Sequence, residues 1–111
     1  MKHKIIVEKI IKYVNKIMRY TEDSTYESFA KNTVLVEACV FNLSQIGELA
    51  NKIDSEFERL NDDIPWRELY GLRNRIVHDY EGVNLVLIWD IIKNDLPELL
   101  IKLNSLYDNF R

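Results

Sequence analysis

Apolar residues recur every three to four positions along almost the whole chain, which is the period of an amphipathic helix. The first stripe consists of Ile6, Ile10, Val14, Ile17 and Met18. It is followed by a polar connection over residues 21–25, in which Ser24 or Thr25 is a candidate helix cap. Residues 26–31 are predicted to form a separate helical turn.

A second, longer helix is predicted from about Asn32 to Phe57, with Asn32 or Thr33 as its cap. Its buried face is traced by Val36, Val40, Leu43, Ile46, Ala50 and Ile53. Gly47 lies in the middle of this helix, where glycine costs about 1 kcal/mol relative to alanine. We therefore expect another helix to cross close to Gly47.

The third and fourth helices are separated from the second by a strong break over residues 61–65. Pro65 suits the first turn of a helix that begins near Trp66 and is predicted to end at Gly82. Asn84 caps the next helix, which Pro97 should kink or restart. The pattern predicts an all-α protein, a single domain over residues 1–111, folded as an antiparallel four- to five-helix up-and-down bundle.

Composition narrows the possible functions only slightly. The 111 residues carry a formal net charge of −3, so bulk charge gives no support to nucleic-acid binding, and any such site must be local. Cys39 is the only cysteine, which excludes an intramolecular disulfide and suits a reducing cytoplasm. No stretch approaches the roughly 20 apolar residues of a membrane span, so we expect a cytoplasmic protein without a membrane partner.

The segment with the richest chemistry is residues 71–80, which contains Arg73, Asn74, Arg75, His78 and Tyr80. Arginine binds phosphate oxygens through a fixed fork of donors, and histidine transfers protons near neutral pH. Together they meet the needs of RNA cleavage by 2′-hydroxyl attack, which requires neither a metal ion nor a cofactor. The alternative is a set of exposed polar residues on a helix, with Tyr80 in the core.

Spacing places a condition on this site. Residues five apart lie about 140° apart on an ideal helix, so Arg73 and His78 do not share a face, whereas Asn74 and His78 do. Either Arg73 reaches around the helix, or the backbone departs from helical geometry, or a second subunit completes the pocket. The end of a helix would also favour a protonated His78.

The segment resembles the HEPN signature, Arg-x4–6-His, in which a polar residue directly follows the arginine and four to six residues separate the arginine from the histidine. More narrowly it resembles the HepT form, Arg-x4-His-x-Tyr, at Arg73, Asn74, His78 and Tyr80. Four further blocks recur in HepT-like proteins at similar spacing: residues 46–48, 64–67, 71–75 and 95–97. The resemblance therefore covers nearly the whole chain and implies a HEPN-like fold.

The resemblance to HepT implies a homodimer whose two motif helices form a shared cleft. It also implies a metal-independent endoribonuclease that acts on RNA as a toxin. Its partner would be a small nucleotidyltransferase antitoxin, MntA, which transfers AMP from ATP to the motif tyrosine, here Tyr80. Asp79 adds a carboxylate that would orient His78 or oppose RNA. Two other functions stay open, a non-catalytic nucleotide-binding or substrate-binding partner of such a transferase, and a purely structural helical dimer.

Three further features allow more than one interpretation. Glu48 would either contact Arg73 or Arg75 and support the site, or form a buried structural ion pair. A basic stripe lies on the first helix: Lys9, Lys12, Lys16 and Arg19. It is either a solvated face or a surface for RNA or an acidic partner. His3 stands near a chain end that should fray, so we expect it to be incidental.

Overall fold

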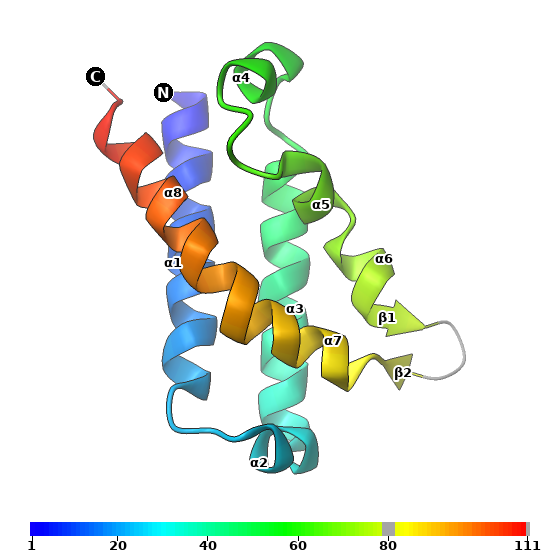
Figure 1. The fold of residues 1–111 in the computed structure, drawn as a ribbon. Coiled ribbons are helices and arrows are strands. Elements are labelled where there is room, and N and C mark those ends of the chain that lie inside the picture. Colours follow the sequence, from blue (N-terminus) through cyan, green and yellow to red (C-terminus); the bar gives the residue numbers. More distant parts are fainter. Residues whose placement is uncertain (79–81, 111) are drawn as a thin grey trace.

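The fold is an up-and-down arrangement of antiparallel helices, with both chain ends at the same end of the molecule (Figure 1). The computed structural model describes residues 1–78 and 82–110, and for Val77 and His78 it describes the backbone alone. The long elements are α1 (Lys2–Thr21), α3 (Thr33–Ala50) and α8 (Leu96–Asp108). The shorter helices are α2 (Tyr26–Lys31), α4 (Ser55–Leu60), α5 (Trp66–Tyr70), α6 (Leu72–Ile76) and α7 (Leu85–Asp90). A π-helical segment, η1 (Ile91–Asp95), joins α7 to α8.

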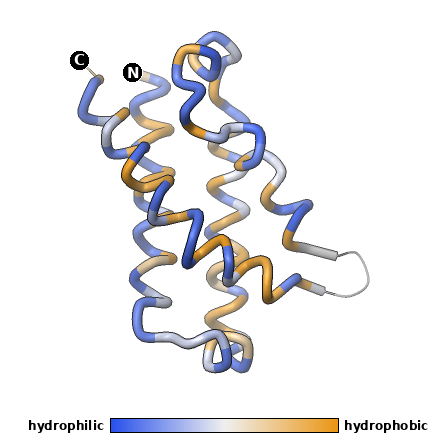
Figure 2. The backbone as a smooth tube through the Cα atoms, in the orientation of Figure 1, coloured by the Kyte–Doolittle hydropathy of each residue, from blue (hydrophilic) through white to orange (hydrophobic). Residues whose placement is uncertain are grey.

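The predicted all-α bundle is confirmed. Helix α1 packs against α3 and α8, and α5 and α6 pack against α3. The long helices alternate between hydrophilic and hydrophobic stretches (Figure 2), and their apolar positions meet in one core. Ile10, Val14 and Ile17 of α1 are fully buried, as the first stripe predicts. In the described part of the chain, no helix combines the length and apolar character required to cross a membrane.

Three helix starts agree with the predicted caps. The side chain of Thr25 accepts a hydrogen bond from the backbone N–H of Ser28, in a reciprocal capping box at the start of α2. Asn32 accepts from the N–H of Leu35 at the start of α3, and Asn84 does the same for α7. Each cap satisfies a backbone donor that the first helical turn leaves without a partner.

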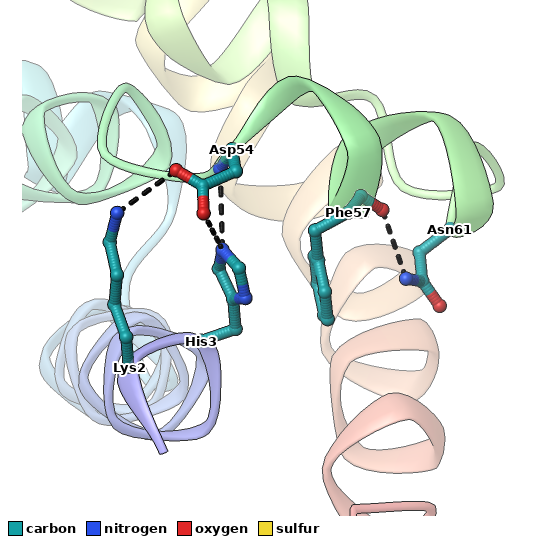
Figure 3. Close-up of polar contacts among 5 residues, drawn as sticks. All are labelled: Lys2, His3, Asp54, Phe57 and Asn61. Carbon is teal, nitrogen blue, oxygen red and sulfur yellow. Dashed lines mark hydrogen bonds and ion pairs between the residues drawn. The ribbon is translucent and has the colours of Figure 1, made fainter.

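The second helix is shorter than predicted, because α3 ends at Ala50 and α4 begins separately at Ser55. The connection is bound to the start of α1 (Figure 3). There the Nζ atom of Lys2 lies 3.0 Å, and the Nε2 atom of His3 3.2 Å, from carboxylate oxygens of Asp54. The hydrogen bond from Lys2 lowers the pKa of Asp54. The His3 ring also stacks on Phe57 at a centroid distance of 4.3 Å, so the expectation that His3 is incidental was wrong.

Gly47 lies at a close helix crossing, as predicted. A Cβ atom at this position would stand 2.8 Å from the backbone carbonyl oxygen of Leu69 in α5. Real Cβ atoms essentially never approach another atom so closely. Glycine therefore lets the backbones of α3 and α5 touch, and α5 leads within two residues into α6. The position of Gly47 in this crossing fixes where α6 lies on the bundle.

Replacing Gly47 with alanine should destabilise the protein. The clash costs about 1–3 kcal/mol, and the better helix propensity of alanine returns about 1 kcal/mol of that, so the net loss is up to about 2 kcal/mol. Each kcal/mol lost should lower Tm by about 4–8 °C, measured by thermal unfolding followed by circular dichroism. Gly71→Ala is the matched control, since its added Cβ would meet no atom closer than 3.7 Å. Equal Tm values for the two variants would contradict the crossing as the reason for Gly47.

Candidate active site

Helix α6 presents three consecutive polar side chains to solvent. Leu72 and Ile76, one turn apart, are buried and hold α6 against α3. Arg73, Asn74 and Arg75 lie between these two anchors, and all three are exposed. The predicted phosphate-binding residues are therefore accessible on a short helix whose apolar side is fixed in the core.

The helix predicted from Trp66 to Gly82 is divided at Gly71 into α5 and α6, and it ends earlier than predicted, at Ile76. Val77 and His78 form a short strand, β1 (Val77–His78), which pairs antiparallel with β2 (Gly82–Val83) in the register Val77↔Val83 and His78↔Gly82. The backbone N–H of Asn84 donates to the carbonyl oxygen of Ile76 at 2.8 Å. Gly82 adopts a φ of 79°, a conformation that favours glycine. The pairing with β2 thus replaces the last predicted turns of the helix.

This change alters the expected geometry of the motif. The chain leaves the helix between Arg73 and His78, so the 140° separation of an ideal helix does not apply to them. The predicted i, i+4 relation between Asn74 and His78 was wrong for the same reason. Three ways of joining Arg73 with His78 were expected: a long reach by Arg73, a non-helical backbone, or a second subunit. In the single chain, the backbone departs from helical geometry between the two residues. Asp79 and Tyr80 lie outside the described residues.

Arg75 contributes to a pocket of about 290 Å³ between α5, α6, η1 and α8. The apolar part of its lining is Pro65, Leu69, Leu72, Ile91, Leu96 and Leu99. Asp95 lies in the same pocket; burial raises the pKa of its carboxyl group, Asp90 adds to the rise, and Arg75 opposes it. Each residue of a helix turns it by about 100°, so Arg73 and Arg75, which are two residues apart, lie on nearly opposite sides of α6. Arg75 therefore borders this pocket, whereas Arg73 lies on the other side of the helix.

The sequence blocks that carry the family resemblance converge in space. Gly47 touches Leu69, which also lines the pocket with Pro65, Arg75 and Asp95. These residues come from α3, from the connection before α5, from α5 itself, from α6 and from the π-helical segment. The sequence reasoning assigned no role to Asp95, although it noted the block at residues 95–97. The structure indicates that the blocks together hold α6 in place.

Glu48 does not have the surroundings that we predicted. It is exposed on α3, so a buried structural ion pair is excluded. Among the described residues, none of the ion pairs joins it to Arg73 or Arg75. Glu48 instead shares a helix face with Phe41 and Val34, which precede it at seven-residue intervals. Phe41 and Val34 are 59% and 78% exposed.

Sequence reasoning missed this apolar face. Phe41 lies off the buried stripe of the second predicted helix, and a large apolar residue on the polar side of an amphipathic helix was the available signal.

Cys39, the only cysteine of the chain, is buried in the core as predicted. Burial raises the pKa of its thiol to about 11, so it stays neutral at physiological pH.

Comparison with known proteins identifies the family. Residues 10–106 match the family described as Ribonuclease HepT-like. "Probable ribonuclease HepT" of Thermococcus cleftensis is 33% identical over 104 residues, which cover 94% of each chain. "Putative RNase MJ1380" of Methanocaldococcus jannaschii is 32% identical over 96 residues, 86% of this chain and 88% of that protein. The chain belongs to the HepT-like ribonuclease family. No solved structure matches it.

Proposed function

We propose that the protein is a metal-independent endoribonuclease toxin of the HepT/MntA type, acting in the cytoplasm. Its membership of a ribonuclease family supports the reaction class. The observation that carries the proposal is the exposure of Arg73 and Asn74 on the helix that leads directly into His78. Arginine, asparagine and histidine follow one another closely in this sequence, and phosphodiester cleavage uses the guanidinium, the amide and the imidazole together.

The proposed reaction is a transesterification within the RNA. The 2′-hydroxyl oxygen attacks the adjacent phosphorus and gives its proton to His78, while the bond from phosphorus to the 5′-oxygen breaks. The guanidinium of Arg73 stabilises the added negative charge on the phosphate, and Asn74 donates a hydrogen bond to it. The 5′-oxygen takes up a proton from water as it leaves, and His78 later returns its own proton to solvent. The products are a 2′,3′-cyclic phosphate and a 5′-hydroxyl end.

Incubation of the purified protein with labelled RNA in EDTA tests this proposal. We expect cleavage products that carry 2′,3′-cyclic phosphate ends, identified by mass spectrometry. Tight nucleotide binding without any cleavage would support the alternative, a non-catalytic partner of a nucleotidyltransferase. Cleavage that requires an added divalent ion would contradict the metal-independent mechanism.

We further propose that an MntA-like nucleotidyltransferase silences the toxin by modifying Tyr80. The phenol oxygen of Tyr80 attacks the α-phosphate of ATP and loses its proton, and pyrophosphate leaves. The AMP group adds bulk and negative charge two residues from His78. RNA phosphate is then excluded by occupancy and by repulsion.

Tyr80→Phe should separate activity from regulation. Because phenylalanine lacks the oxygen that accepts AMP, the variant should cleave RNA at the wild-type rate after treatment with the transferase and ATP, whereas the treated wild type should lose cleavage. Intact-mass measurement reports the added AMP. If folded Tyr80→Phe protein has already lost cleavage before treatment, the phenol belongs to the catalytic site and this regulatory scheme is wrong.

The proposed enzyme is a homodimer that associates through the exposed face of α3. Two large apolar side chains, Phe41 and Val34, stand on this face, and apolar residues that share an exposed face are characteristic of protein–protein interfaces. Helix α3 also carries α6, which holds Arg73. A two-fold contact along α3 would place two motifs on one assembled surface, as the resemblance to HepT implies.

A further inference from the structure

Positive charge is concentrated on one helix of an otherwise acidic chain. Helix α1 contains six Lys and Arg residues and one Glu, a net charge of +5. The rest of the chain contains nine Lys and Arg residues and 17 Asp and Glu residues. The net charge of −3 therefore hides a strong separation of charge, and α1 is the element that attracts anions.

The charges form a single row on the outward face of α1. Lys9, Lys12, Lys16 and Arg19 are all exposed, while the opposite face packs into the core. At 1.5 Å per residue the row is about 15 Å long. We call these four residues the α1 basic row.

The row has few intramolecular partners. Lys12 lies 4.0 Å from Glu8, the only carboxylate on the helix. Among the described residues, no ion pair includes Lys9, Lys16 or Arg19. Like charges three or four residues apart repel one another along a helix. A linear polyanion would relieve that repulsion, whereas water alone only screens it.

Two tyrosines flank the row. Tyr13 and Tyr20, seven residues apart, lie on the same side of α1. Tyr20 is 44% exposed. Tyr13 is half-buried against the core, and the Nζ atom of Lys16 stands 5.5 Å from its ring centroid. Cations that follow a backbone, next to rings on which bases stack, are typical of surfaces that bind single-stranded nucleic acid. An acidic protein surface would need the cations but not the rings.

We propose that the α1 basic row is a second RNA-binding surface, separate from the cleavage motif, that holds single-stranded RNA away from the scissile bond. This inference rests on the proposed RNA substrate. Helix α1 packs on α3 and α8, and in Figure 1 it lies on the opposite side of the molecule from β1 and β2. The row therefore increases the affinity for long RNA and contributes nothing to the cleavage of a dinucleotide.

Binding of an RNA strand that the protein cannot cleave tests the proposal. The probe is a fluorescent 20-nucleotide 2′-O-methyl RNA, and anisotropy is measured from about 50 to 200 mM salt. Four phosphate contacts on a single strand give a log–log slope of about −2.8, or about 50-fold weaker binding across this range. Replacing all four residues of the row with alanine should remove that dependence and raise KM for long RNA without changing kcat. Alanine favours the helix, so α1 should stay folded.

Two matched variants complete the experiment. The first replaces the three lysines of the row with arginine and should retain the wild-type slope. The second removes the same number of exposed positive charges elsewhere, at Lys31, Lys52, Arg59 and Arg67. It should also retain the wild-type slope. If the second variant loses as much affinity as the alanine variant, net charge explains binding and the proposal fails.

The remaining outcomes distinguish this inference from the proposed function. Wild-type protein that binds the probe with the expected slope but cleaves no RNA would support the row and contradict the ribonuclease. If the alanine variant binds and cleaves long RNA as the wild type does, RNA binding by the α1 basic row is contradicted and the proposed ribonuclease activity is not. The same conclusion would follow if the alanine variant lost binding to polyglutamate but kept its affinity for RNA, since the row would then be a surface for an acidic protein.

Discussion

RNA cleavage should fall by about 10²–10⁴-fold when His78 is replaced with alanine, because the reaction then lacks its general base. Arg73→Ala should lower the rate by about 10²–10³-fold through the loss of charge stabilisation on the phosphate. Initial rates on a labelled RNA in EDTA measure both effects. Arg73 is exposed on α6, so its removal should leave the thermal unfolding curve unchanged.

Matched variants exist for both residues. His3→Ala removes the other histidine and should keep full cleavage, with a lower Tm because the stacking on Phe57 and the contact with Asp54 are lost. Arg59→Ala removes an exposed arginine that pairs with Glu56 inside α4, and it should also keep full cleavage. Wild-type rates in folded His78→Ala or Arg73→Ala protein would disprove the proposed chemistry.

Phe41→Glu should convert the proposed dimer into monomers. Loss of a central aromatic contact costs about 2 kcal/mol or more, and each two-fold interface contains the substituted residue twice. The dissociation constant should therefore rise about a thousandfold. Molar mass from light scattering at micromolar protein measures the change, and cleavage should fall with it if the active cleft is shared.

Ile101→Glu is the control for this variant. Ile101 is 72% exposed on α8, which packs against α1 and η1 and away from the α3 face. The added charge is the same as in Phe41→Glu, but it lies outside the proposed interface. Ile101→Glu should therefore stay dimeric and active. If the Phe41→Glu protein is still dimeric, the interface lies elsewhere. If the wild type is monomeric, the proposed dimer does not exist.

Local signals in the sequence predicted most of the fold. The caps at Thr25, Asn32 and Asn84 depend on side chains bonding to backbone atoms three residues away, so they can be read from the chain itself. The close crossing at Gly47 was predictable because mid-helix glycine is costly without a packing reason. In both cases the physical cause lies within a few residues of the signal.

The two misplaced helix ends have causes that lie far away in the sequence. Hydrophobic periodicity continues through Ile53 and Phe57, but the carboxylate of Asp54 binds Lys2 and His3, about 50 residues earlier. The motif helix stops at Ile76 because the amide of Asn84 and the strand pairing with β2 take over its hydrogen bonds. Periodicity reports a buried face and does not register such distant partners.

For the candidate site, the sequence indicated the residue types and the family, but not the surroundings that the fold gives these residues. The residue types at Arg73, Asn74 and His78 indicated phosphate chemistry, and the resemblance to HepT placed them in a family. The proximity of Arg75 to Asp95 was not predictable, because it brings residues 20 apart to the lining of one pocket that exists only in the folded bundle. Phe41 was missed because its significance depends on which face of α3 stays uncovered.

The π-helical segment before Pro97 has a consequence for how this chain tolerates changes in length. In it the N–H of Leu96 donates to the carbonyl of Ile91, five residues back, so η1 winds more loosely than the helices on either side. One turn of a π-helix takes about one residue more than a turn of an α-helix, so deleting one residue from η1 would restore ordinary winding and leave α7 and α8 in nearly the same relative orientation. Inserting one residue there would instead rotate α7 by about 100° relative to α8 and turn Asp95 away from Arg75. Within residues 91–95 we therefore expect a single deletion to be tolerated better than a single insertion.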